Sequence, residues 1–225
     1  FFAAIPENGM RAIAALDQAC DNARCSSDHG DFMSVLSELV LELNREPVAV
    51  IATMPITGKQ WPFRVGGEQL IDLVFTQLYS TRSLGALPRQ VSRASFGGLE
   101  EMVAAFVSRR EPTQFDLSLG LYYTTWCREE FPFYDESIDD DLLSELEEQF
   151  GTAVAGALSS DGIAAYCDIF EVTPAPAVEN HRLVSPIHTL VFAGAFDPIT
   201  PPAWSLQVAD SLSNSVYVEM SNHGH

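Results

Sequence analysis

The chain has 225 residues, 47% of them hydrophobic, which allows one large domain or two small ones with a substantial core. Its formal net charge of −19 argues against binding to the phosphate backbone of nucleic acids and to anionic membranes. No apolar run approaches the roughly 20 residues that a membrane span needs, and no signal peptide is recognisable at the N-terminus. The acidity predicts a solvated acidic surface, or one that attracts cationic substrates such as peptide amines.

Helical patterns dominate the first part of the chain. Apolar residues recur at helical spacing, and Asp31 stands where it would cap the start of a helix. The strand-like segment between Pro47 and Pro55 is restricted by both prolines to a short edge strand or hairpin. Leu117–Trp126 mixes β-branched and aromatic residues, and its state stays open. The predicted helices cover residues 9–20, 31–44, 66–80, 87–94, 99–110 and 139–151.

The pattern changes after a proline-rich stretch that we interpret as an extended linker. HTLVFAGA is a short apolar run typical of a buried parallel strand, AWSLQVADSLSN is predicted to be a helix, and SVYVEMS a second strand. This order predicts a β–α–β unit, and therefore an α/β fold class. Since two strands alone do not form a stable sheet, we expect the remaining strands to come from sequence outside this chain.

An acid and a histidine follow the two predicted strands. Asp197 lies in the loop FDPITPP directly after the first strand, and His225 follows the second strand in NHGH. An α/β hydrolase places its catalytic triad on loops at the C-terminal ends of strands, in the order Ser, acid, His. Asp197 has a second interpretation as a turn former before Pro198, and His223 is a rival candidate for the base.

These segments resemble the tripeptidyl and prolyl aminopeptidase-like branch of the α/β hydrolases. That branch typically reads G-x-x-D-P-x-T-P-P-x-W, followed by a helix and by a strand that ends in G-H-G; here GAFDPITPPAW and NHGH stand at those places. The resemblance extends upstream through AIAALDQACDNARC, GEQLIDLVFTQLYS and ALPRQVSRA. It also includes YYTTWCREEFPF, and AYCDIFEV, in which Phe170 replaces a tryptophan.

The resemblance implies a division of the chain and a set of roles. Residues 1–172 would form a helical lid, 173–187 a linker, and 188–225 the C-terminal part of an α/β-hydrolase fold. Asp197 would be the triad acid and His225 the triad base.

Acidic lid residues hold the free amine of the substrate in aminopeptidase relatives. The resemblance therefore implies that Glu129 and Glu130 bind substrate, through charge-assisted hydrogen bonds. Their alternative interpretation is a solvated acidic pair beside a disulfide. Asp139–Asp141 is most simply the start of a helix. No metal and no organic cofactor is implied, because the histidines are scattered without ligand spacing.

The nucleophilic serine is missing from the pattern. No G-x-S-x-G occurs; Ser95 in RASFGG is the nearest approach, but it lacks the first glycine and follows helical sequence. Ser159–Ser160 is a weaker candidate. We therefore expect this chain alone to be inactive. Its partners would be a small peptide or ester substrate and the upstream catalytic half of the same hydrolase, since both ends of the chain look cut. The alternative is a non-catalytic binding module or a degenerate hydrolase.

Four cysteines are present, at positions 20, 25, 127 and 167. The sequence permits three pairings; Cys20 and Cys25 are near enough for a small loop disulfide, which would leave Cys127 to pair with Cys167. Free thiols are the alternative. Disulfides would place the protein outside the reducing cytoplasm, as a secreted or periplasmic protein.

Overall fold

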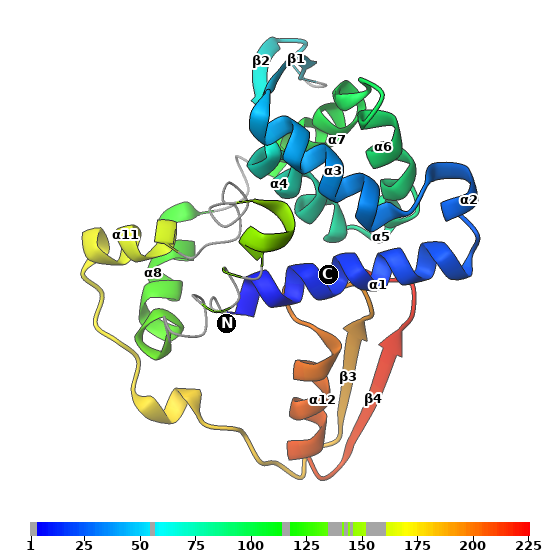
Figure 1. Cartoon of the computed structure of the whole chain (residues 1–225). Coiled ribbons are helices and arrows are strands. Elements are labelled where there is room, and N and C mark those ends of the chain that lie inside the picture. Colours follow the sequence, from blue (N-terminus) through cyan, green and yellow to red (C-terminus); the bar gives the residue numbers. More distant parts are fainter. Residues whose placement is uncertain are drawn as a thin grey trace.

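Helices form most of the upper part of the molecule, and a small β–α–β unit lies below them (Figure 1). The computed structural model describes residues 4–54, 57–113, 118–134, 141, 144, 146–151 and 161–225. The helices outside the β–α–β unit are α1 (Ile5–Asn22), α2 (Ser26–His29), α3 (Phe32–Arg45), α4 (Gly67–Leu78), α5 (Thr81–Leu84), α6 (Leu87–Ala94), α7 (Leu99–Thr113), α8 (Leu119–Glu129) and α11 (Asp161–Phe170), with 3₁₀ turns η2 (Phe131–Phe133) and η3 (Ala177–Asn180).

Helix α3 shows how the sequence builds the helical core. The Asp31 carboxylate accepts a hydrogen bond from the backbone N–H of Ser34 at 2.8 Å, which confirms the predicted cap. Leu36 and Val40 are fully buried at helical spacing, and α3 packs against α1, α4 and α6. The predicted helices are confirmed, although for 139–151 only residues 141, 144 and 146–150 are described, and these are helical.

A β-hairpin follows α3. Strand β1 (Val48–Thr53) pairs in antiparallel fashion with β2 (Gln60–Val65), which confirms the predicted short edge strand. Pro62 stands within β2, where a two-stranded ribbon tolerates the missing N–H. The β2 strand was not predicted.

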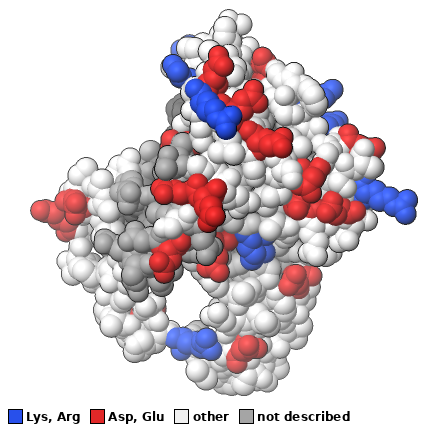
Figure 2. Space-filling model, in the orientation of Figure 1, with Lys and Arg blue, Asp and Glu red and all other residues white. Residues whose placement is uncertain are grey.

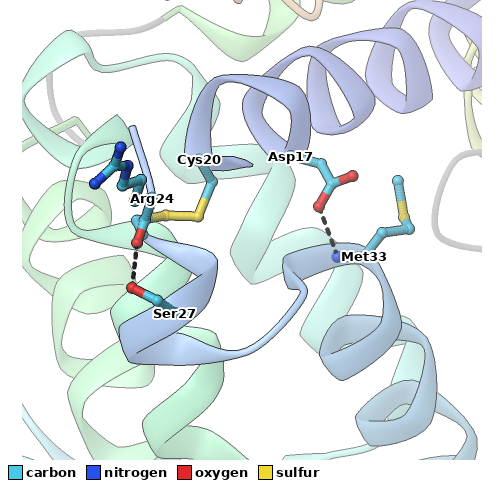
Figure 3. The surroundings of a disulfide bond; sticks show 6 residues. Asp17, Cys20, Arg24, Ser27 and Met33 are labelled. Carbon is cyan, nitrogen blue, oxygen red and sulfur yellow. Dashed lines mark hydrogen bonds between the residues drawn. A yellow bond between two sulfur atoms is a disulfide. The ribbon is translucent and has the colours of Figure 1, made fainter. Parts of the chain in front are cut away.

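Two disulfides cross-link the helical part of the chain. They join Cys20 to Cys25 and Cys127 to Cys167, so the favoured pairing is confirmed. The first links the end of α1 to the turn before α2 (Figure 3). The second joins α8 to α11, at the left of Figure 1. The segment whose state was left open is helical from residue 119, and Ser118 caps it.

The C-terminal unit contains strand β3 (Thr189–Gly194), helix α12 (Pro202–Ser211) and strand β4 (Ser215–Met220). The two strands are parallel, and α12 packs against both. This confirms the predicted β–α–β unit. The expectation of a buried strand is met only in part, because Leu190 and Phe192 of β3 are each 55% exposed. Within the described residues, α12 covers one face of this sheet and the face bearing these side chains stays open.

The segment predicted to be an extended linker, residues 173–187, is not wholly extended. It contains the 3₁₀ turn η3 and a bridge between Ser185 and Leu212. The predicted boundaries at residues 172 and 187 stay predictions. In the described part of the chain, no helix combines the length and the apolar character needed to cross a bilayer.

Candidate functional site

Asp197 and His225 meet at the ends of the two parallel strands. His225 Nδ1 lies 3.0 Å from Oδ2 and 3.1 Å from Oδ1 of Asp197, across a sequence separation of 28 residues. Both residues follow the carboxyl end of a strand, and parallel strands present these ends at one edge of a sheet. Asp197 is 5% exposed, whereas the side chain of His225 is 41% exposed. The carboxylate is therefore shielded while the imidazole stays accessible.

Residues 197–200, with the sequence DPIT, themselves supply hydrogen-bond donors to the buried Asp197 carboxylate. The backbone N–H groups of Ile199 and Thr200 donate to Asp197 Oδ1 at 2.8 and 2.9 Å, and the Thr200 hydroxyl donates to Oδ2 at 2.7 Å. The Thr200 hydroxyl oxygen also lies 3.4 Å from His225 Nδ1. Asp197 thus forms a turn and contacts the histidine at once, so the two interpretations of this residue are compatible. A carboxylate that accepts several donors is fixed in orientation.

The chain around His225 is held by close backbone contacts. Phe196 N–H donates to the carbonyl of His223 at 2.9 Å, and Gly224 N–H donates to Thr81 Oγ1 at 3.3 Å. A Cβ atom at Gly224 would collide with the backbone carbonyl at the end of α4. Only glycine therefore allows this approach. It is His225 whose ring contacts Asp197, while His223 contributes its backbone carbonyl.

A tyrosine of the helical part of the chain contacts the imidazole directly. The ring of Tyr79, which follows α4, meets the His225 ring edge-on, with centroids 5.3 Å apart and an interplanar angle of 78°. With Nδ1 turned to Asp197, a neutral ring carries its proton on Nδ1 and its lone pair on Nε2. This is the tautomer in which a histidine can accept a proton from a hydroxyl group.

Arg11, on α1, was missed by the sequence reasoning. Its Nη1 donates to the carbonyl of Ala195 at 3.0 Å, and its Nη2 donates to the carbonyl of Asp197. Burial lowers the pKa of this guanidinium, and the charges of Asp197 and Glu219 oppose that shift. The only sequence signal was a cation within an otherwise apolar helical pattern.

The other predicted residues lie elsewhere. Glu129 and Glu130 end α8, which packs mainly against α11 and η2; Glu129 is exposed and Glu130 half-buried. Figure 1 draws α8 at the left and the C-terminus beside α1. Their substrate-binding role stays a prediction.

The serine candidates gain no support from the described structure. Ser95 is exposed at the C-terminal end of α6, and its hydroxyl donates to the carbonyl of Ser92 at 2.7 Å. A nucleophile elbow needs a strand before the serine, and Ser95 follows a helix. Ser159–Ser160 lie outside the described residues, as do Asp139 and Asp140 of the predicted acidic helix start; Asp141 is helical and exposed.

Acidic side chains are spread over the face shown in Figure 2, in keeping with the charge of −19. One acidic group is compact: carboxylate oxygens of Asp17, Asp21 and Asp31 all lie within 4.8 Å of one another. Asp17 accepts a hydrogen bond from Met33 N–H, drawn in Figure 3, and Asp31 caps α3. Burial, followed by the charges of the neighbouring acids, raises the pKa of Asp17 against the effect of that hydrogen bond. The cluster thus has a structural explanation at the start of α3.

The β–α–β order with an acid and a histidine at adjoining strand ends is typical of the C-terminal part of an α/β-hydrolase fold. Residues 152–225, which contain both side chains, match the family model described as TAP-like protein. This C-terminal part of the chain is therefore similar to the tripeptidyl-aminopeptidase-like branch of the α/β-hydrolase superfamily. No curated protein and no solved structure matches the chain.

Proposed function

We propose that the chain is the lid and C-terminal catalytic segment of a serine hydrolase, which removes peptides from the N-terminus of its substrates or cleaves esters. The observation that carries this proposal is the hydrogen bond between the shielded Asp197 carboxylate and Nδ1 of the accessible His225. The match of this segment to a hydrolase family supports it. The fold hosts both peptide and ester cleavage, so the substrate is the less supported part.

In the proposed reaction, a serine outside this chain attacks the carbonyl carbon of the substrate. His225 Nε2 takes the hydroxyl proton as the Ser Oγ–carbon bond forms, and it returns this proton to the leaving amine or alcohol as the scissile bond breaks. Water then hydrolyses the acyl-enzyme by the same proton transfers. Asp197 holds the imidazole in the Nδ1–H tautomer and stabilises the imidazolium that forms.

The missing half would dock on the open face of the C-terminal sheet. Leu190 pairs with Val216 and Phe192 with Val218, and these four side chains are 55%, 60%, 55% and 37% exposed. Parallel sheets are normally covered on both faces, and an uncovered apolar face with free strand edges favours association. We propose that the upstream half of the same hydrolase supplies the covering elements, the nucleophile and the oxyanion hole.

Two disulfides support a location outside the reducing cytoplasm, either secreted or periplasmic. A substrate-binding role for Glu129 and Glu130 belongs to the same proposal: the pair would hold a substrate amine by charge-assisted hydrogen bonds. Peptides with free and acetylated amino termini test this point, because only the free amine gains from the carboxylates. The proposed pair predicts faster cleavage of the free peptide, and loss of that preference in Glu129→Gln/Glu130→Gln.

A fluorophosphonate probe, which labels activated serines, tests the proposal on this chain and on a form extended upstream. We expect labelling of the extended form only. Labelling of this chain alone would overturn the assignment of the nucleophile and return attention to Ser95. Labelling of neither form would favour the second candidate, a non-catalytic binding module or degenerate hydrolase, for which the open apolar sheet face would be the binding surface.

A further inference from the structure

Arg11 ties the first helix to the loop that carries Asp197. Its two terminal nitrogens donate to the carbonyls of Ala195 and Asp197, which flank Phe196 where β3 ends. The N–H of Asp197 donates to the carbonyl of Gly194 at 3.1 Å and closes this turn. Helix α1, 186 residues away in sequence, thus grips the backbone from which the Asp197 side chain projects.

The planar guanidinium suits this task better than other cations. Two N–H groups in a fixed fork can reach two carbonyl oxygens at once, whereas a lysine ammonium is a point charge on a flexible stem. Within the described residues, Arg11 Nε is buried without a hydrogen-bond partner. The half-buried cation is therefore held by these two carbonyls, with the charges of Asp197 and Glu219 nearby. Because burying a charged group costs free energy, stability alone does not explain a cation at this position.

The contacts of Asp197 divide into two sets. Its backbone carbonyl is held by Arg11, while its carboxylate is directed toward His225 by Thr200 and the neighbouring N–H groups. We infer that Arg11 is a positioning residue: it fixes the Asp197 loop so that the carboxylate keeps the proton of neutral His225 on Nδ1. Its value for catalysis rests on the proposed function, because small displacements of a catalytic group cost large factors in rate. The effect on His225 does not depend on that function.

The test is the tautomer of His225, read from the ¹⁵N chemical shifts of its ring nitrogens at alkaline pH. Arg11→Lys keeps the charge and loses the fork; Arg11→Met loses both. Arg89→Met is the matched control, since Arg89 is an exposed partner of Glu101. We expect the wild type and the control to carry the proton on Nδ1, and both Arg11 variants to shift most of it to Nε2.

Retention of the Nδ1–H tautomer in Arg11→Met would overturn the inference. Loss in Arg11→Met with retention in Arg11→Lys would also overturn it, because charge alone would then suffice. If both variants unfold, the wild type still gives an answer: the Arg11 Nη protons should be resolved and protected from exchange, and rapidly averaging signals would contradict the two hydrogen bonds. A tautomer that responds as expected, in an extended form that no fluorophosphonate labels, would refute the hydrolase proposal and leave this inference standing.

Discussion

Replacing Thr200 by valine removes a single hydroxyl from the buried acid site and preserves the branched shape of the side chain. The lost hydrogen bond is the one from Thr200 Oγ1 to Asp197 Oδ2, at 2.7 Å. A hydrogen bond to a charged group contributes about 1.5 to 3 kcal/mol. Asp197 keeps its other donors, namely the N–H groups of Ile199 and Thr200 and the ring of His225. We therefore expect the free energy of unfolding to fall by about 1.5 kcal/mol, near the lower end of this range.

For a chain of this size, about 1.5 kcal/mol corresponds to a fall of roughly 3 to 6 °C in the unfolding temperature. Thermal and urea unfolding of Thr200→Val would measure it. Thr124→Val is the matched control, because the exposed Thr124 hydroxyl donates to the backbone carbonyls of Gly120 and Leu121 and so bonds to no charged group in the described residues. The control should change stability by less than about 0.5 kcal/mol.

A double-mutant cycle assigns the effect to the right partner. In an Asp197→Asn background the acceptor is no longer an ionised carboxylate, so Thr200→Val should cost less by about 1 kcal/mol. Equal costs in both backgrounds would mean that the hydroxyl acts through packing and not through the carboxylate. An unchanged stability in the wild-type background would refute the geometry of the acid site itself.

Three further outcomes are expected in unfolding experiments. Asp31→Ala should cost about 1 kcal/mol at neutral pH, because it removes the cap of α3. Hydrogen bonds from the side-chain hydroxyl and the backbone N–H of Ser34 lower the pKa of Asp31. The cap's contribution to stability is therefore complete above the pKa that Asp31 has in the unfolded chain, and it is lost as pH falls through the lower pKa of the folded state. A stability loss in Asp31→Ala that stays constant down to strongly acidic pH would contradict this account. Replacing Cys127 and Cys167 by serine opens a loop with a sequence separation of 40. The loop-entropy model gives about 4 kcal/mol, and faster hydrogen exchange in α8 and α11 should reveal the loss. Gly224→Ala should lower the free energy of unfolding by about 1 to 3 kcal/mol in thermal unfolding, because the added Cβ would collide with backbone atoms. Gly120→Ala is the control and should not lower stability, because a Cβ there meets open space.

The elements that could be predicted are those whose causes are local. Helix α3 follows from a capping aspartate and apolar residues at helical spacing. The C-terminal unit follows from two apolar runs around a helical segment, and the family-like spacing of Asp197 and His225 gave the pair that the structure brings together. Strand β2 was missed because Pro62 and mixed polarity hide it, and its pairing with β1 depends on the hairpin as a whole.

The support of the acid and histidine loops could not be predicted, because it comes from distant side chains that bind the backbone of these loops. Arg11 bonds to carbonyls, which every residue has, so no residue type in the loop marks its partners. The side-chain hydroxyl of Thr81 accepts a hydrogen bond from the backbone N–H of Gly224 across 143 residues. The exposed face of β3 and β4 was also missed, because a run of apolar residues does not say which face a neighbouring element covers.

The measurement that tests the central claim most directly is the fluorophosphonate labelling rate of the upstream-extended form in two histidine variants. His225→Gln removes the proposed base, and loss of a triad histidine costs about 10⁶-fold in the best-studied case. His223→Gln changes only a neighbouring ring and keeps the backbone carbonyl that accepts from Phe196. We predict that labelling falls by at least about a thousandfold in His225→Gln and stays within a few-fold in His223→Gln. Similar rates in both variants, or the larger loss in His223→Gln, would contradict the assignment of His225 as the base.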